Sequence, residues 1–396
     1  MPKHLRDGGD SGPPTDTESK RNKAEQSTTD DHQVNKTQVD SCHTSQYAND
    51  KYIVGWICAI NAEYVAAQEF LDEEHGQPQY VSPNDNNNYT LGKASGHMVV
   101  ISTLPLGEYG TSSAATVARD MLHSFTNVRI GLMVGIAGGA PSEDHDIRLG
   151  DIVVSAAGRG RGGVLQYDFG KQMQGQQDLE NIGVLNQPPP LLRGAVSGLM
   201  AEYMRSGHQL ADMVEVVLKK KPRLRRKFNR PDSSMDRLYE SGIVHAENAG
   251  PSCVAFCDFS KIIKRHKRDE DEDNPAIHYG LIGSANRLMK DALERDSLSS
   301  KHGILCFEME AAGLMNHFPC LVVRGICDYS DSHKNKDWQG FAAMMAAAYA
   351  KDLLRQIPPN KIEAEAKLVD IVTDGELTSI LGKLLLPLTA ASSRNG

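Results

Sequence analysis

The sequence predicts an α/β fold, a single three-layer α/β/α domain built on a central mixed, mostly parallel sheet. Short, nearly continuous apolar runs, typical of strands covered on both faces, recur along the chain, and stretches with helical spacing separate them. The predicted strands are residues 52–60, 98–102, 130–134, 152–155, 279–282, 304–307 and 321–326, and the predicted helices are 111–122, 285–293 and 339–354. In such folds the active site lies at the carboxyl ends of the strands.

The chain has 396 residues, of which 40% are hydrophobic, enough for one large α/β domain or two ordinary ones. Its formal net charge of −8 argues against nucleic acid as the main partner. The N-terminus has no apolar stretch after a basic start, and no run of about twenty apolar residues occurs, so we expect neither a secretory signal nor a membrane span. Seven scattered cysteines suit a reducing compartment, and we expect a cytoplasmic protein.

Composition divides the chain into three parts. Residues 1–50 are polar and nearly free of aliphatic side chains, which predicts a disordered N-terminal tail. Residues 51–356 form the predicted domain, with a charged insertion at about 187–274. Residues 357–396 are expected to form a linker and a short amphipathic helix at 376–386.

Two charge clusters mark the insertion. The basic run 219–227 is interpreted as a solvated helix face, and a nuclear-localisation or polyphosphate-binding role stays open. The basic run 264–268 is followed at once by five acids at 269–273, and such an opposite-sign block predicts a solvated loop. Cys253 and Cys257 stand four residues apart, as in half of a zinc site, but no second Cys or His pair with matching spacing follows. No metal site is therefore expected.

Four motifs lie at or near the ends of predicted strands. They are Ile57-Cys-Ala-Ile-Asn-Ala-Glu63, Val134-Gly-Ile-Ala-Gly-Gly139 with Leu149-Gly-Asp-Ile-Val-Val-Ser155, Phe307-Glu-Met-Glu-Ala-Ala-Gly313, and Val323-Arg-Gly-Ile-Cys-Asp328. In this order and spacing they resemble the purine and uridine phosphorylase superfamily, especially its methylthioadenosine/adenosylhomocysteine nucleosidase branch and fungal nucleosidase-like effector domains. The resemblance covers residues 52–356. It implies a nucleoside phosphorylase-like fold, cleavage of the N-glycosidic bond of a purine nucleoside or nucleotide, and no metal or organic cofactor.

Two carboxylates are expected to carry the chemistry. Asp328 follows the apolar run 321–326 and on its own would be interpreted as a helix cap, but the resemblance implies that it protonates N7 of the purine. Glu63 lies in the first turn of a predicted helix at 62–71, where a carboxylate is favourable, and the resemblance implies that it activates the attacking water. Hydrolysis of a glycosidic bond requires such an acid and base pair.

The resemblance also implies a set of substrate-binding residues. Glu310 would accept the ribose 2′- and 3′-hydroxyls, since an ionised carboxylate suits a vicinal diol, while Met309 would pack on the sugar and Glu308 would support it. Gly135 and Gly138 are expected to let the backbone approach the ribose and the attacking water.

The base-binding stretch departs from the family pattern. Asn286 is expected to hydrogen-bond a purine edge, but the usual Asp-Ala-Phe is replaced by Ala285-Asn-Arg287, which leaves the base preference open.

The phosphate-binding positions of a phosphorylase are also altered. The first motif lacks the usual Arg, and Met133 and Ile136 stand where a second Arg and a Ser would be. Apolar side chains cannot bind a dianion, so we expect water as the nucleophile, with a phosphate-dependent phosphorylase as the alternative.

Cations follow Asp328 closely in the sequence. The loop with His333, Lys334 and Lys336 is interpreted either as solvated or, together with Arg287 or Arg324, as the receiver of a 5′-phosphate or triphosphate. The second interpretation makes ATP a candidate substrate. A third functional hypothesis is a catalytically inactive nucleotide-sensing or partner-binding module, against which the complete set of Glu63, Glu310 and Asp328 argues. The resemblance further implies a homo-oligomer.

Overall fold

The computed structural model describes residues 44–371, except 159, 176–178, 246–252, 254–256 and 270. Most of the predicted tail and the predicted helix at 376–386 lie outside the described residues. The predicted tail extends too far, because Ser45 is buried and bonds the hydroxyl of Tyr52 at 3.0 Å. Within the described residues, no helix is long and apolar enough to cross a bilayer.

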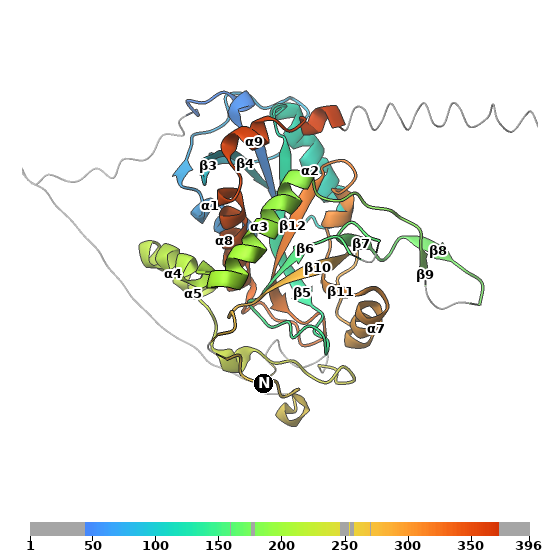
Figure 1. The fold of residues 1–396 in the computed structure, drawn as a ribbon. Coiled ribbons are helices and arrows are strands. Elements are labelled where there is room, and N and C mark those ends of the chain that lie inside the picture. The colour runs from blue at the N-terminus through green and yellow to red at the C-terminus, as the bar shows by residue number, and fades with distance from the viewer. Residues whose placement is uncertain are drawn as a thin grey trace, which may run out of the picture. The chain divides into compact units, whose positions relative to one another are not determined.

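A mixed, mostly parallel sheet forms the centre of the fold (Figure 1). Its strand order is β11-β10-β6-β12-β5-β1-β4-β3-β2, β7 pairs with β10, and β11 also pairs with β5. The five strands from β11 to β5 therefore close on themselves. The bounds are β1 Val54–Cys58, β2 Glu73–Glu74, β3 Tyr89–Ala94, β4 His97–Thr103, β5 Ile130–Gly139, β6 Ile152–Ser155, β7 Val164–Gln166, β10 Ile277–Ser284, β11 Ile304–Glu308 and β12 Cys320–Asp328. A separate two-stranded sheet pairs β8 Gly170–Gln172 with β9 Leu179–Asn181.

All seven predicted strands are present, as are three of the four helices predicted within the described residues, α1 (Asn61–Glu69), α2 (Thr111–Ser124) and α8 (Gln339–Arg355). The predicted helix at 285–293 is wrong. The backbone of this segment is bonded elsewhere, since Ala285 N donates to Glu308 O and Asn286 N donates to the Asp168 carboxylate. The helix α7 (Ala292–His302) starts only after Asp291, whose carboxylate accepts the first free N–H groups of the helix.

Helices cover the sheet, and α8 is the best buried of them. It packs on β12 and β5, and α1 (Asn61–Glu69) packs against it. Figure 1 shows α8 and α1 on one side of the central strands and α7 on the other. Close packing of α8 needs a glycine on β12, because a Cβ at Gly325 would lie 1.9 Å from Ala342 O. This contact fixes the strand that carries Arg324 and Asp328.

Much of the predicted insertion is helical and covers α8. The helices α3 (Pro190–Ser206), α4 (Leu210–Lys220) and α5 (Arg225–Phe228) all contact α8. The basic run 219–227 lies at the end of α4 and through α5, where its charged side chains are exposed. Three of them pair with surface glutamates, so the solvated interpretation is confirmed for this run. A role in localisation stays a prediction.

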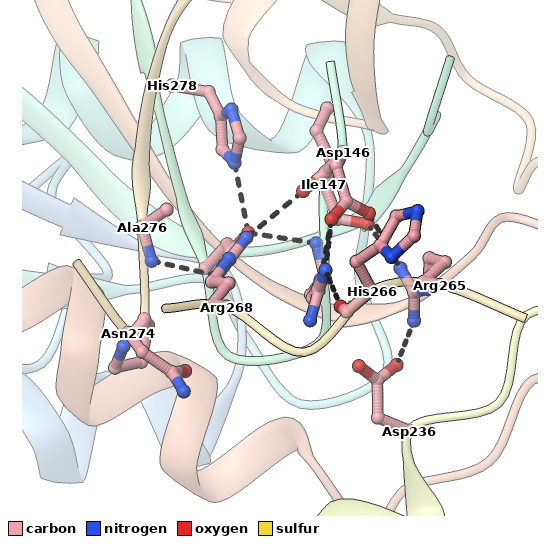
Figure 2. A network of polar contacts seen from close by, with 12 residues as sticks. Asp146, Ile147, Asp236, Arg265, His266, Arg268, Asn274, Ala276 and His278 are labelled. Carbon is pink, nitrogen blue, oxygen red and sulfur yellow. Dashed lines mark hydrogen bonds and ion pairs between the residues drawn. The ribbon is translucent and has the colours of Figure 1, made fainter. Parts of the chain in front are cut away.

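The second charge cluster corrects an expectation, because two of its cations are partly buried and paired rather than solvated. Arg268 binds both oxygens of the fully buried Asp151 at 2.6 Å, and His278 Nε2 and Ala276 N also bond that carboxylate. Figure 2 labels Arg268, His278 and Ala276 in this network. Arg265 donates to Asp236 at 2.9 Å and to Ile147 O at 3.0 Å. The charge pattern of the segment did not reveal these partners, since Asp151 is 117 residues away in the sequence.

Candidate active site

Four charged side chains gather at the carboxyl ends of the central strands. Glu63 lies in the first turn of α1, Glu308 ends β11, Glu310 follows it, and Arg324 lies within β12. The strands β1 and β12 run parallel to β5 on either side of it, so their carboxyl ends share one edge of the sheet. All four side chains are buried, and Arg324 is completely so.

Arg324 is enclosed by three carboxylates. Its Nη2 bonds Glu308 Oε2 and lies 3.7 Å from Glu310 Oε2, while its Nη1 lies 3.9 Å from Glu63 Oε1. Its Nε and Nη1 have no hydrogen-bond partner among the described groups. A buried arginine requires such counter-charges, and these acids outnumber it, which leaves the cluster with an excess of negative charge.

Glu63 is held rigidly by the backbone. Its Oε2 accepts Ala59 N at 2.6 Å and Ile60 N at 3.1 Å, and its Oε1 accepts Ile136 N at 2.8 Å. Burial raises the pKa of Glu63, although Arg324 and these N–H groups oppose the shift. Glu63 thus accepts backbone N–H groups at the start of α1, where a carboxylate is favourable, while its Oε1 also faces Arg324.

Glu308 and Glu310 have different hydrogen-bond partners. Glu308 accepts from Glu310 N and Ala311 N and pairs with Arg324, so it fixes the turn after β11. Glu310 Oε1 accepts Gly110 N at 3.2 Å, at the start of α2. Burial, together with the charge of Glu308, raises the pKa of Glu310 to about 7, against the effect of Arg324. Met309 between them is partly buried.

Asp328 forms a second buried centre at the end of β12. Its Oδ1 accepts Ser330 N at 2.9 Å, and Lys334 Nζ lies 2.8 Å from its Oδ2. Burial acts to lower the pKa of Lys334, but the charge of Asp328 outweighs it and the pKa is raised. Lys334 is therefore an ion-pair partner of Asp328 in this structure.

Two glycines of β5 make room for these side chains. In the strand register Gly135 lies opposite Arg324 and Gly138 opposite Asp328. A Cβ at Gly135 would lie 2.4 Å from Glu63 Oε1, and one at Gly138 would lie 2.6 Å from Asp328 Oδ1. These two glycines therefore allow the backbone to approach Glu63 and Asp328 closely, whereas the expected close approach was to the ribose and the attacking water. The two positions are three residues apart, about 10 Å along a strand.

Two expected substrate-binding residues have structural partners instead. Asn286 Oδ1 accepts Thr111 N at 2.9 Å and so caps α2, which leaves its side-chain amide N–H groups to meet a purine edge. Arg287 is paired with Glu294 and lies over the ring of Tyr167, 5.1 Å from its centroid. Because Arg287 is already paired with Glu294, it is not an unpaired cation that a phosphate group could bind.

The loop after Asp328 also differs from the phosphate-binding interpretation. His333 is 7% exposed and stacks on Tyr239 with 3.9 Å between ring centroids. Lys336 is exposed. Of the positions where a phosphorylase would have Arg and Ser, Met133 is fully buried and Ile136 contributes only its backbone N–H to the cluster.

The sequence did not reveal Arg324 as the centre of the cluster, and its residue type suggested only a phosphate ligand. Its signal was a charge inside the apolar run 321–326, since an arginine in a buried strand must be paired. Nor did the sequence reveal Gly110 or the pairing of Lys334 with Asp328.

The carboxylate cluster is closed to solvent in this structure. Glu63, Glu310 and Asp328 are only 3%, 5% and 4% exposed. Cavities of about 530 Å³ and about 540 Å³ lie elsewhere, one beside Pro141 and His302 and the other beside Arg230 and Trp338, and neither is lined by these carboxylates. A ligand therefore needs a local opening to reach them.

The chain is similar in sequence and in fold to several known proteins. Residues 54–357 match the sequence profile of the Phosphorylase superfamily. A nucleotide-binding leucine-rich repeat (NLR)-like protein of Hyaloscypha variabilis is 41% identical over 350 residues, which is 88% of this chain and 34% of that protein, so the chain spans about a third of that relative. The 5′-methylthioadenosine/S-adenosylhomocysteine nucleosidase of Mycobacterium bovis is 22% identical over 77% of this chain and 96% of its own. Among solved structures, the futalosine hydrolase of Helicobacter pylori matches with a TM-score of 0.48 and 14% identity, over 78% of this chain and 99% of its own.

Proposed function

The chain belongs to the phosphorylase superfamily, and from this premise we propose that it is a purine nucleosidase, which hydrolyses the N-glycosidic bond of a purine nucleoside or nucleotide. One observation carries the proposal: Glu63 and Glu310 meet at Arg324, and Asp328 follows on the same strand. An inert binding module has no need of three buried carboxylates in this arrangement, because each costs free energy to bury.

Each carboxylate has a distinct part in the proposed reaction. Glu63 accepts a proton from water as the water oxygen forms a bond to C1′ of the ribose. The C1′–N bond breaks, its electron pair passes to the purine, and Asp328 passes a proton to the departing base as it takes one from the ammonium of Lys334, which lies 2.8 Å away. Glu310 holds the two ribose hydroxyls as the ionised carboxylate.

The spacing of the acid and the base along β5 supports the proposal, once a local opening admits the substrate. Glu63 contacts β5 at Gly135 and Asp328 contacts it at Gly138, positions about 10 Å apart. Carboxylates that act with a water between them and the sugar are typically about 6.5–9.5 Å apart. The excess negative charge around Arg324 would stabilise the positive charge that develops on the ribose in an oxocarbenium-like transition state.

Charge supports water over phosphate as the nucleophile. The cations of the cluster are Arg324, enclosed by three carboxylates, and Lys334, paired with Asp328. A phosphate dianion would meet net negative charge there and would find no uncommitted cation. Arg324 Nη1 retains an unused donor 3.9 Å from Glu63 Oε1, a pair of groups that suits a neutral water.

The same pairings bear on the substrate's 5′ position. Arg287 and Lys334, which one of the two interpretations assigned to a phosphate or triphosphate, are bound to Glu294 and Asp328. We therefore favour a nucleoside with an uncharged 5′ group over ATP.

The test is chromatography of adenosine, inosine, guanosine, 5′-methylthioadenosine and ATP after incubation with the purified chain, with and without phosphate. We expect free base and the free ribose moiety without phosphate, and loss of that activity in Asp328→Asn. The matched control is Asp337→Asn, an exposed aspartate of the same segment, which should retain activity. Strict phosphate dependence with release of ribose 1-phosphate would establish a phosphorylase, and binding without cleavage would establish an inactive nucleotide-binding module.

A further inference from the structure

Four potential metal ligands converge between the insertion and the loop that follows β12. Cys253 and Cys257 are joined by a backbone hydrogen bond, in which Cys257 N donates to Cys253 O at 3.0 Å. His245 precedes them in the insertion, and His333 belongs to the loop after Asp328. One side-chain atom of each residue, a sulfur or a ring nitrogen, lies within 4.8 Å of all the others.

The distances between these atoms match the edges of a zinc coordination tetrahedron. His245 Nδ1 lies 3.1 Å from Cys257 Sγ and 3.7 Å from Cys253 Sγ, and His333 Nδ1 lies 3.5 Å from Cys257 Sγ and 3.6 Å from Cys253 Sγ. With Zn–S of about 2.3 Å and Zn–N of about 2.05 Å, tetrahedral angles place S and N about 3.6 Å apart. All four S···N separations lie close to this value.

The sulfurs and ring nitrogens also satisfy the distance criterion for weak hydrogen bonds, and Cys253 Sγ lies 3.9 Å from His333 O. His333 Nε2 lies 3.1 Å from Ile243 O, a carbonyl that only accepts, so Nε2 carries the proton and Nδ1 presents a lone pair. Both sulfurs lie at 3.5–3.6 Å from that single lone pair. One thiol proton at most can be donated to it, whereas a cation at the centre would be bound by both sulfurs and both nitrogens.

The surroundings of the cluster resemble the supporting shell of a metal site. A ligating histidine commonly donates its other ring N–H to a backbone carbonyl, as His333 does to Ile243 O. The ring of His333 is fixed by stacking on Tyr239, and the backbone of His245 is fixed by donation to Ser332 Oγ at 2.9 Å. These contacts fix the ring of His333 and the backbone of His245 beside the two sulfurs.

We propose that His245, Cys253, Cys257 and His333 bind one zinc ion in a Cys₂His₂ structural site. Four protein ligands fill a tetrahedral shell and leave no open position for catalysis. The ion joins the insertion to the loop that holds Lys334, the ion-pair partner of Asp328. The sequence did not reveal the site because its two histidines stand in different segments, 88 residues apart and without the paired spacing of a zinc finger.

The test begins with the metal content of the full chain purified without chelators, measured by elemental mass spectrometry. We expect about one zinc per chain, and little in Cys257→Ser or His245→Ala. Cys320→Ala is the matched control, because Cys320 is a buried free cysteine outside the cluster, and it should keep the full zinc content. Removal of zinc by a chelator should lower the melting temperature, and added zinc should restore it.

A second measurement does not depend on whether the variants fold. The wild-type chain stripped of zinc should bind one equivalent of Co²⁺ and show thiolate-to-cobalt charge-transfer absorption. Wild-type protein that is folded yet takes up neither metal would overturn the proposal. So would a Cys253–Cys257 disulfide found by thiol titration and peptide mapping, or zinc that persists in both ligand variants.

Discussion

The ammonium of Lys334 lies 2.8 Å from the carboxylate of Asp328, and the two side chains are only 19% and 3% exposed. The cation that follows the proposed acid in the sequence is therefore its partner and not a free receiver of phosphate. A buried pair of this kind is costly to break from either side, because the remaining charge is left in a poorly solvated position.

The first prediction concerns this pair. Lys334→Met should lower the free energy of unfolding by about 3–5 kcal/mol, because Asp328 loses its counter-charge. Asp328→Asn should also destabilise the chain, and the double variant should lose less than the sum of the two, with a coupling of about 1–3 kcal/mol. Urea unfolding of the four proteins measures this cycle, and strict additivity would mean that the pair does not form in solution.

The second prediction separates chemistry from binding at Glu63. Glu63→Gln should lower kcat by about 10²–10⁴-fold, the usual effect of losing a general base, while KM changes little. The amide places a donor among three backbone N–H groups, so some loss of stability is expected as well. Glu69→Gln on the same helix is the control and should leave kcat unchanged. Equal activity of the two variants would remove Glu63 from the mechanism.

The third prediction uses the pKa of about 7 at Glu310. A ribose diol donates to the ionised carboxylate, so binding must displace a proton below about pH 7, and affinity should fall about tenfold per unit as the pH drops from there. Calorimetry in two buffers of different ionisation enthalpy should detect proton release near pH 6. Glu310→Gln should bind weakly and release no proton.

The raised pKa of Glu310 also predicts how the stability of the ligand-free chain changes with pH. Its pKa in the folded chain is raised above that of the unfolded chain, so its favourable contribution is complete below about pH 4.3 and is lost as the pH rises through about 7. Glu310→Gln should remove this part of the decline in melting temperature. An unchanged pH profile in the variant would contradict the assignment.

The fourth prediction tests the close approach at Gly138. A Cβ there would lie 2.1 Å from Ser330 Oγ and 2.6 Å from Asp328 Oδ1, and both of those residues are buried. Gly138→Ala should displace Asp328 and lower kcat/KM by about 10²-fold, with about 1–3 kcal/mol of destabilisation. Gly194→Ala, in α3 with no atom within 4 Å of the new Cβ, should be neutral or slightly stabilising. Steady-state kinetics and thermal melts check both.

The fifth prediction concerns the attachment of the insertion to the core. Arg268→Met leaves the fully buried Asp151 without its bidentate partner and should cost about 3–5 kcal/mol. Burial acts to raise the pKa of Asp151, but Arg268 and His278 together hold it below its usual value. The stability that this carboxylate provides is therefore present above about pH 4 and lost in acid, and in the variant the loss should begin at a higher pH. Lys267→Met, an exposed neighbour, should melt like the wild type.

The sequence by itself determined seven strands, three of the four helices predicted within the described residues, and the residues of the proposed mechanism. Apolar runs and helical spacing are local properties, so β12 and α8 could be predicted from their own residues. The motifs that end in Glu63 and Asp328 stand at strand ends, and parallel strands bring such ends to one edge.

The tertiary structure alone decided which charges meet. Arg324 is surrounded by three acids from two segments, Asn286 caps α2, Arg268 reaches Asp151, and His333 meets the two cysteines of the insertion. Each of these contacts joins segments that are distant in sequence through loops whose paths no periodicity encodes. A charge in a sequence shows only that a counter-charge or water is needed, and the fold determines which of them it finds.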